Sequence, residues 1–296
     1  MSAYRTDLAM ERTPSGKAEA MEGVTVDSSR EGSMEVTLVT IRDEQTAATI
    51  GKACGHYWTL TVPELPHMLP EDRIPVAARL AEALRELLPA SGDVLVLGLG
   101  NRRLTADALG DRVVSGILVT RHLSEPGFRG VCALAPGVLG VTGMETAEMA
   151  LALTKRLHPA AVIVVDALAA METAHICTTV QVTDTGIRPG SGVGNHRAEI
   201  SRDTLQVPVI AVGIPMVVYT STIVRDALQL ILSRESTQEE AETMAAQLTD
   251  GMQGEMIVTP RDIDETVQGL ADMLALAINA ALQPQCSMEE LRLCLH

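Results

Sequence analysis

Aromatic residues are scarce in this chain of 296 residues, which has one Trp, three Tyr and one Phe. A buried core must therefore be filled by Ala, Val, Leu, Ile and Met, and a hydrophobic content of 46% argues against a disordered chain. Basic residues are also in deficit, with 23 Lys and Arg against 38 Asp and Glu and a formal charge of −15. Because phosphate binding needs a basic surface, direct binding of nucleic acid is not expected.

Long apolar runs and cysteine pairs are missing as well. The longest apolar stretch, VPVIAVGIPMVVY, is too short to cross a bilayer and holds two prolines, so no membrane insertion is expected. The first residues, MSAYRTDLAMERT, are charged and lack the apolar segment of a secretory signal. Five scattered cysteines without a CxxC pair favour a reducing cytosol over a disulfide framework or a structural zinc site.

The apolar pattern predicts an α/β fold. Alternating residues predict strands over 34–41 and 56–62, and helical spacing predicts a helix over 74–89. Helix-like segments, notably 144–158, separate several of the compact apolar runs that follow. These runs are 93–98, 130–134, 160–165 and 207–213. Strands alternating with helices indicate a largely parallel sheet flanked by helices on both faces.

The two ends of the chain are expected to differ. Residues 1–34 are polar and are predicted to be loosely held. Beyond Pro215 the chain is predicted to turn helical, in amphipathic segments over 221–234, 237–252 and 262–282. We expect these helices to pack against the sheet and form the helical C-terminal part of one domain.

Two aspartates in similar settings are candidates for catalysis. Asp166 ends the apolar run in IVVDALA, and Asp107 follows VLVLGLGN, with Thr105 as a predicted helix cap. Ligands gather at the carboxyl ends of parallel strands, so the fold can bring both carboxylates to one cleft. One pKa should then rise, which gives an acid beside a base that can activate water and protonate a leaving amine. The alternative is that each Asp only caps or pairs locally.

The loop DTGIRPGSGVGN, residues 184–195, is rich in glycine, and its backbone N–H groups could cradle an anion or a peptide. It lacks the spacing and the Lys of a phosphate-binding loop, so an ordinary turn is the alternative. His122 in VTRHL follows another apolar stretch, where a surface salt bridge or a core position is the more ordinary role. Thr142 and Glu145 resemble a capping box.

Together these segments resemble the germination protease family, endopeptidases of spore-forming bacteria that degrade small acid-soluble spore proteins. The matching segments run in order along nearly the whole chain: RTDLAME, GLGNRRLTADALG, VTRHL, APGVLGVTGMET, VIVVDALAA, TTVQVTDTGIRPGSGVGN, VPVIAVGIPMVVYTSTI and MIVTPRDID.

The resemblance implies a phosphorylase/hydrolase-like fold related to the hydrogenase-maturation proteases. It also implies an aspartic-type mechanism without an essential metal or other cofactor. The family's catalytic aspartates fall in its TxDALG and DALA motifs, which here contain Asp107 and Asp166. We further expect a homotetramer in the cytoplasm of the spore core. The candidate substrate-binding residues are Gly190, Ser191, Gly192, Asn195 and His122.

The resemblance also implies a zymogen that processes itself. Targets of the family are cut within Ser/Thr-Glu followed by Phe/Ile-Ala-Ser/Gly-Glu. The segment Thr6-Asp7-Leu8-Ala9-Met10-Glu11 has this order, with Asp for Glu, Leu for the apolar residue and Met at the small position. We expect a cut between Asp7 and Leu8 that removes residues 1–7 as a propeptide and leaves 8–296 as the protease domain. The alternative is an ordinary polar terminus.

Two positions depart from the family pattern, and both are expected near the cleft. Tyr219 stands where an acidic residue is expected after PMVV, and Met216 stands where Thr is expected. Two other functions stay open. One is a metal-dependent maturation-type protease with Asp107, Asp166 and a histidine such as His122 as ligands. The other is a non-peptidase, phosphorylase-like binding protein that uses the Gly-rich loop.

Overall fold

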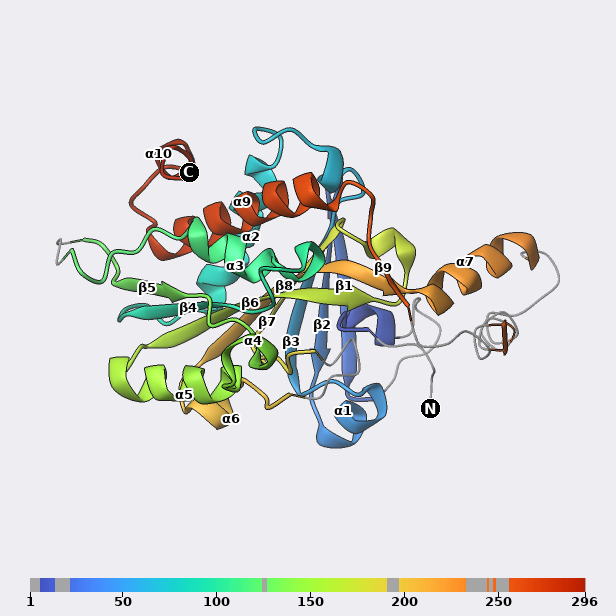
Figure 1. The fold of residues 1–296 in the computed structure, drawn as a ribbon, viewed down its shortest axis with the longest axis horizontal. Coiled ribbons are helices and arrows are strands. Elements are labelled where there is room, and N and C mark those ends of the chain that lie inside the picture. Colours follow the sequence, from blue (N-terminus) through green and yellow to red (C-terminus); the bar gives the residue numbers. More distant parts are fainter. Residues whose placement is uncertain are drawn as a thin grey trace.

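The fold is a mixed β-sheet flanked by helices, as seen in a computed structural model (Figure 1). The structure describes residues 6–13, 22–123, 127–190, 197–232, 244, 247–248 and 256–295. Within this part of the chain the sheet has nine strands in the order β1-β2-β3-β7-β8-β6-β4-β5, with β9 paired to β8. The strands are β1 Val24–Glu31, β2 Met34–Ile41, β3 Gly55–Thr61, β4 Val94–Gly98, β5 Val131–Leu134, β6 Ala161–Ala170, β7 Thr179–Thr183, β8 Val209–Tyr219 and β9 Ile257–Val258.

The helices follow the predicted alternation with the strands. The α-helices are α1 Glu44–Ile50, α2 Ile74–Leu87, α3 Leu109–Ser115, α4 Leu139–Thr142, α5 Thr146–Leu157, α6 Arg202–Leu205, α7 Thr220–Leu232, α9 Ile263–Leu282 and α10 Met288–Leu293. Short 3-10 helices are η1 Met10–Arg12, η2 Leu65–His67, η3 Thr105–Asp107 and η4 Thr173–His175. Among the described helices, none combines the length and the apolar character that a bilayer crossing requires.

The parallel part of the sheet consists of β5, β4, β6 and β8, the four apolar runs found in the sequence. The pairs β1–β2, β2–β3, β3–β7 and β7–β8 are antiparallel. The α/β class is therefore confirmed, while the sheet is mixed rather than largely parallel. The strand β7 was not predicted, because TVQVT has a Gln at its centre and is buried on both faces.

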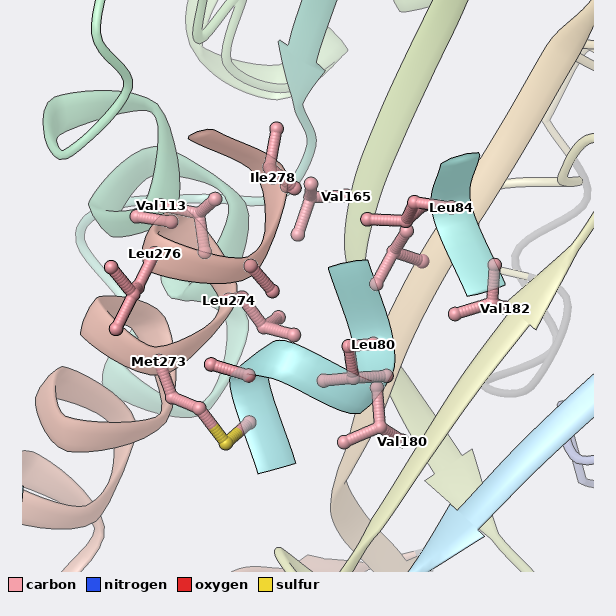
Figure 2. Close-up of a cluster of buried hydrophobic side chains, with 14 of the residues drawn as sticks. Leu80, Leu84, Val113, Val165, Val180, Val182, Met273, Leu274, Leu276 and Ile278 are labelled. Carbon is pink, nitrogen blue, oxygen red and sulfur yellow. The ribbon is translucent and has the colours of Figure 1, made fainter. Parts of the chain in front are cut away.

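The main core lies between the sheet and the layer formed by α2, α3 and α9 (Figure 1). Helix α2 has Pro75 in its first turn, where the missing N–H leaves no hydrogen bond unmade. The second half of α9, residues 273–282, is buried all round, which follows from its near-continuous apolar sequence. Figure 2 shows side chains of this core: Leu80, Leu84, Val113, Val165, Val180, Val182, Met273, Leu274, Leu276 and Ile278.

The opposite face of the sheet is covered by α1, α5 and α6 (Figure 1). Leu95 and Val164, on the second side of β4 and β6, pack there with Ala150 of α5 and Leu205 of α6. The expectation that helices cover both faces is confirmed.

The expectation that residues 1–34 are loosely held is wrong for two segments. Strand β1 pairs with β2 along its whole length, from Val24 opposite Ile41 to Glu31 opposite Met34. Residues 6–13 lie against the sheet, where Leu8 is fully buried. The polar sequence does not predict this order, because β1 is an edge strand with mostly exposed side chains that is held chiefly by backbone pairing.

The expectation that the chain turns helical beyond Pro215 is wrong by four residues, since β8 continues to Tyr219. Pro215 cannot donate to the ladder, and the register with β6 shifts next to it. Leu168 pairs with Pro215 and Ala169 with Val217, so that Met216 bulges out. The predicted helix over 237–252 lies outside the described residues, apart from 244 and 247–248.

Candidate active site

Parallel strands β4 and β6 bring the two candidate aspartates together. Gly98, the last residue of β4, pairs with Val165, so the chain leaves β4 beside Asp166 on β6. The backbone N–H of Leu99 donates to the carbonyl oxygen of Val165 at 2.8 Å and extends this pairing by one residue. Asp166 does not follow its strand as the sequence suggested, because β6 continues to Ala170, but it lies beside the point where the shorter β4 ends.

A tight turn then positions Asp107. Gly100 adopts φ +101, and a Cβ at this residue would lie 2.0 Å from the carbonyl oxygen of Asp107, so only glycine fits. The backbone N–H of Asn101 donates to Asp107 Oδ2 at 2.8 Å. Thr105 is not the cap that the sequence suggested, because η3 begins at Thr105 itself and has no side-chain cap bond.

The two carboxylates line one cavity of about 760 Å³ at the carboxyl ends of β4 and β6. Its wall also includes Asp7, from the N-terminal segment, and the ion pair between Glu145 and Arg197, whose Oε1 and Nη1 atoms are 3.2 Å apart. The capping box suggested for Thr142 and Glu145 does not form, since Glu145 makes no side-chain cap bond to α5. Its carboxylate binds Arg197 instead.

The electrostatic setting differs between the two carboxyl groups. Asp166 is 6% exposed, and burial raises its pKa well above the ordinary value, with the charges of Asp107 and then Asp7 raising it further. The pKa of Asp107 is also raised by burial, but the hydrogen bond from Asn101 works against that rise. Asp166 is therefore the carboxyl that keeps its proton, and Asp107 is the one that ionises first.

The N-terminal segment Thr6–Glu11 lies along the last residues of β6. The backbone N–H of Asp7 donates to the carbonyl oxygen of Ala169, and the N–H of Ala169 donates to Asp7 Oδ2, both at 2.9 Å. Leu8 packs in a buried apolar cluster with Leu168 and Val218. Asp7, the first residue of the proposed cleavage pair, thus lies at the wall of the cavity that holds the two candidate catalytic aspartates, and Leu8 is buried next to it.

The carboxylate of Glu11 occupies a polar nest at the end of β6. It accepts hydrogen bonds from the backbone N–H of Met171 at 2.7 Å and of Glu172 at 2.9 Å. Its Oε1 is 2.7 Å from His175 Nδ1, and its side chain is fully buried. Burial acts to lower the pKa of His175, but the hydrogen bond and the charge of Glu11 outweigh it and raise that pKa. The nest therefore selects an acidic side chain at this position.

Two polar side chains hold the backbone of the same segment. Lys52 Nζ donates to the carbonyl oxygens of Asp7 at 2.8 Å and Thr6 at 3.2 Å. Gln181 Nε2 donates to the carbonyl oxygen of Asp7 at 3.0 Å, and Gln181 Oε1 accepts from the N–H of Ala9 at 2.8 Å.

Of the predicted substrate-binding residues, the structure places Gly190 on the cavity wall. Ser191, Gly192 and Asn195 lie outside the described residues. His122 is not brought to the site. It lies on an exposed turn whose neighbours Thr120 and Arg121 donate backbone hydrogen bonds to Val131, at the opposite end of the parallel strands. In the described part of the chain, no group of three or more His, Cys, Asp or Glu side chains has a metal-binding arrangement.

The two residues that depart from the family pattern do not line the cavity. Met216 is fully buried on the core side of the sheet, where its sulfur lies 3.7 Å from Cys177 Sγ. Tyr219 is also buried. Met216 follows the regular alternation of Ile214 into the core, and the bulge turns its neighbour Val217 to the same face, where it lines the cavity.

Sequence reasoning missed Lys52, Gln181 and His175 at this site. Each comes from a separate element, and they meet only on the docked N-terminal segment. A weak signal exists for Gln181, since an amide inside the strand pattern TVQVT needs a buried partner.

Comparison with known proteins supports the resemblance seen in the sequence. The chain matches the pattern of the germination protease family over residues 4–253. A germination protease of Caldanaerobacter subterraneus subsp. tengcongensis is 38% identical over 317 aligned positions, which cover 99% of this chain and 98% of the relative. Germination proteases of Clostridium perfringens and Bacillus cereus are 37% and 33% identical, and the alignments cover 98% and 97% of this chain and 98% and 95% of the relatives.

Among solved structures, a NiFe hydrogenase maturation protease, HycI from Thermococcus kodakarensis, aligns with a TM-score of 0.35 at 15% identity. The alignment covers 66% of this chain and 98% of that one. The assignment comes instead from the family pattern and from relatives above 30% identity along nearly the whole of both sequences, and the chain belongs to the germination protease family.

Proposed function

We propose that this protein is an endopeptidase of the spore core that degrades small acid-soluble spore proteins, with Asp107 and Asp166 as its acid–base pair. The observation that carries the proposal is the pairing of two carboxylates of unequal proton affinity in one cavity. Membership of the germination protease family supplies the reaction class.

In this mechanism Asp107 is the base and Asp166 the acid. The Asp107 carboxylate takes a proton from a water molecule, whose oxygen forms a bond to the carbonyl carbon of the substrate. Asp166 gives its proton to the leaving nitrogen as the C–N bond breaks. The raised pKa of Asp166 keeps that proton available at a pH where an ordinary Asp has lost it. No metal or other cofactor takes part.

The docked N-terminal segment supports the substrate class. The segment presents Leu8 and Ala9, both fully buried, and then Glu11 in its nest of N–H donors. An apolar residue, a small one and an acidic one at this spacing is the order expected in the target motif. In this proposal the enzyme carries a copy of its own target.

The same segment supports synthesis as a zymogen. In the proposal residues 1–7 are a propeptide, and the Asp7–Leu8 bond is cut by the molecule's own aspartates, leaving 8–296 as a single protease domain. Mild acid promotes the cut because it returns the acidic pair to its singly protonated form. The protein further assembles as a homotetramer, which light scattering would test.

The deciding experiment is incubation of the purified protein with a small acid-soluble spore protein, followed by mapping of the fragments by mass spectrometry. We expect one cut before the apolar residue of each acidic motif, at the same rate with a chelator present. The Asp166→Asn variant, folded as judged by circular dichroism, should cut nothing. Near-normal cutting by that variant would remove Asp166 from the mechanism. Loss of activity in chelator, restored by one metal, would favour a metal-dependent protease.

A further inference from the structure

The carbonyl oxygen of Asp7 is the acceptor for two side-chain donors at once. Lys52 Nζ lies 2.8 Å from it and Gln181 Nε2 lies 3.0 Å from it. This oxygen belongs to the peptide bond between Asp7 and Leu8, and Asp7 lines the cavity that holds Asp107 and Asp166. A cation and an amide N–H on one peptide oxygen suit the negative charge that this oxygen gains when water adds to the carbonyl.

The sheet register places Gln181 across from Asp166. Asp166 on β6 pairs with Gly213 on β8, and Gly213 pairs with Gln181 on β7. Directly paired residues point to the same face of a sheet, so both side chains project to the side opposite the main core. Their backbones are two strand spacings apart, about 10 Å. Gly213 adds no side chain between them, and a Cβ there would lie 2.6 Å from Leu168.

Both donors are fixed before any reaction takes place. Gln181 is 6% exposed, and the N–H of Ala9 holds its amide oxygen, which turns the amide nitrogen to Asp7. Lys52 follows the end of α1, where Gly51 adopts a left-handed conformation and the N–H of Lys52 donates to Ala47. Burial lowers the pKa of Lys52, and the charge of Asp7 opposes that change. Such preorganised donors need no rearrangement as charge develops.

The N-terminal segment is also held by contacts that do not involve Lys52 or Gln181. Asp7 makes two hydrogen bonds with Ala169, Leu8 is buried among apolar side chains, and Glu11 binds the N–H groups of Met171 and Glu172. Lys52 and Gln181 also bind Thr6 and Ala9, but the carbonyl oxygen of Asp7 is an acceptor on which both side chains converge.

We propose that Lys52 and Gln181 are catalytic residues that bind the carbonyl oxygen of the cleaved bond, both in the self-cut and in substrates. This inference rests on the proposed function. As the water oxygen bonds to the carbonyl carbon, the π electrons move onto the oxygen, where the two donors stabilise them. Asp107 holds the proton from water. The electrons then re-form the C=O bond, the C–N bond breaks, and the Leu8 nitrogen takes the proton of Asp166.

The test measures the first-order rate of the self-cut at Asp7–Leu8 by intact mass, in the full-length protein at mildly acidic pH. Lys52→Met and Gln181→Met each remove one donor and keep a side chain of similar length. Each should slow the cut by about 100-fold. Lys155→Met and Gln45→Met, at exposed positions, are the matched controls and should cut at the wild-type rate.

Two further measurements separate chemistry from docking. Hydrogen exchange at the Ala169 amide, which donates to Asp7 Oδ2, reports whether the segment stays bound. Lys52→Arg keeps a cationic donor and should recover part of the rate. When a peptide with the sequence of residues 1–14 is supplied as a separate substrate, Lys52→Met and Gln181→Met should lower kcat and leave KM unchanged.

The outcomes distinguish this inference from the proposed function. If Asp166→Asn blocks the cut but Lys52→Met and Gln181→Met cut at the wild-type rate, the inference is wrong and the proposed function stands. A slow cut accompanied by loss of Ala169 protection, not restored by Lys52→Arg, would also overturn it. If Asp166→Asn cuts normally while the two Met variants are slow, the donor pair stands and the aspartate mechanism fails. A wild-type protein that is never cut at Asp7–Leu8 would overturn the self-processing and this inference, while cleavage of spore proteins would still uphold the protease assignment.

Discussion

The two ends of the parallel strands place aspartates in opposite surroundings. At the amino ends, Asp93 lies just before β4, and its Oδ2 is 3.0 Å from Nε of Arg121. At the carboxyl ends, Asp166 is buried with Asp107 and Asp7 as its charged neighbours, and no cation is among the causes of its shifted pKa. The same residue type is thus neutralised by a partner at one end of the sheet and by its own proton at the other.

The wider surroundings repeat this contrast. A cavity of about 540 Å³ at the amino ends is lined by Arg85 and Arg129. Their guanidinium groups donate to backbone carbonyl oxygens near the ends of α9 and α2, at Ala280 and Pro89. Cations there satisfy the free carbonyls of helix ends, an ordinary structural task. The buried carboxyl groups of Asp107 and Asp166 have no such task, which makes the carboxyl end the place to seek chemistry.

The two ends of the strands should differ most in how their aspartates affect activity. Asp107→Asn removes the base, and we expect the self-cut at Asp7–Leu8 to slow by at least about 1,000-fold. Asp93→Asn, the matched change at the other end, should leave the rate within about twofold, because its carboxylate is a half-exposed ion-pair partner. Intact mass against time measures both. Equal rates in the two variants would show that the setting of the aspartate does not matter.

The next largest effect concerns the N-terminal segment Thr6–Glu11, which lies at the carboxyl end of the strands. Leu8→Ala removes a fully buried side chain from its cluster with Leu168 and Val218, and should weaken docking of the segment by about 2–4 kcal/mol. Hydrogen exchange at the amides of Ala169 and Met171 would speed up accordingly. Leu69→Ala, at an exposed leucine, serves as the control and should change neither. Unchanged protection in Leu8→Ala would mean that the segment is held by its polar contacts.

A smaller effect is expected on stability against pH. Because the pKa of Asp166 is raised in the folded protein, the unfolded chain loses this proton first as pH rises above about 3.8, and stability falls up to the folded pKa. In the Asp166→Asn variant this residue does not titrate, so it causes no loss of stability as pH rises. The variant should therefore have a higher Tm than wild type near pH 7, with the gain vanishing towards pH 4. A Tm gain that is independent of pH would show that the carboxyl is not protonated in the fold.

The smallest effect is expected at the amino end. Arg121→Ala breaks the pair with Asp93, and both side chains are more than 40% exposed. We expect a loss of less than about 1 kcal/mol in the free energy of unfolding, reduced further by salt. Urea unfolding at low and high salt measures it. A loss of several kcal/mol would mean that this end of the sheet is as sensitive as the other.

The helices and strands that the sequence predicted are those whose burial produces a regular local pattern of apolar residues. The four parallel strands are short apolar runs, and α2 has a regular apolar stripe, so both follow from spacing alone. Strand β1 was not predicted, because an edge strand needs no apolar side chains. The Asp107–Asp166 pair was reachable because strand ends in α/β folds share an edge.

The rest of the site depends on contacts between distant parts of the chain. Lys52 ends a helix and Gln181 sits in the middle of a strand, and nothing near either residue in the sequence shows that both reach Asp7. His175 meets Glu11 in the same way, across more than 160 residues. Such convergence is fixed by strand order and register, which local patterns do not encode.

If the Asp7–Leu8 bond is cut as proposed, the complete burial of Leu8 affects what happens next. Hydrolysis of the Asp7–Leu8 bond turns an amide nitrogen that donates to Thr6 Oγ1 into an α-ammonium group. Residues 8–13 stay tethered, so they would compete for the cleft at an effective concentration on the order of millimolar. A new positive charge at a fully buried apolar residue is poorly solvated, however, and favours departure into water. The cut itself would thus drive residues 8–13 out of the cleft and open it to substrate, without a separate release factor.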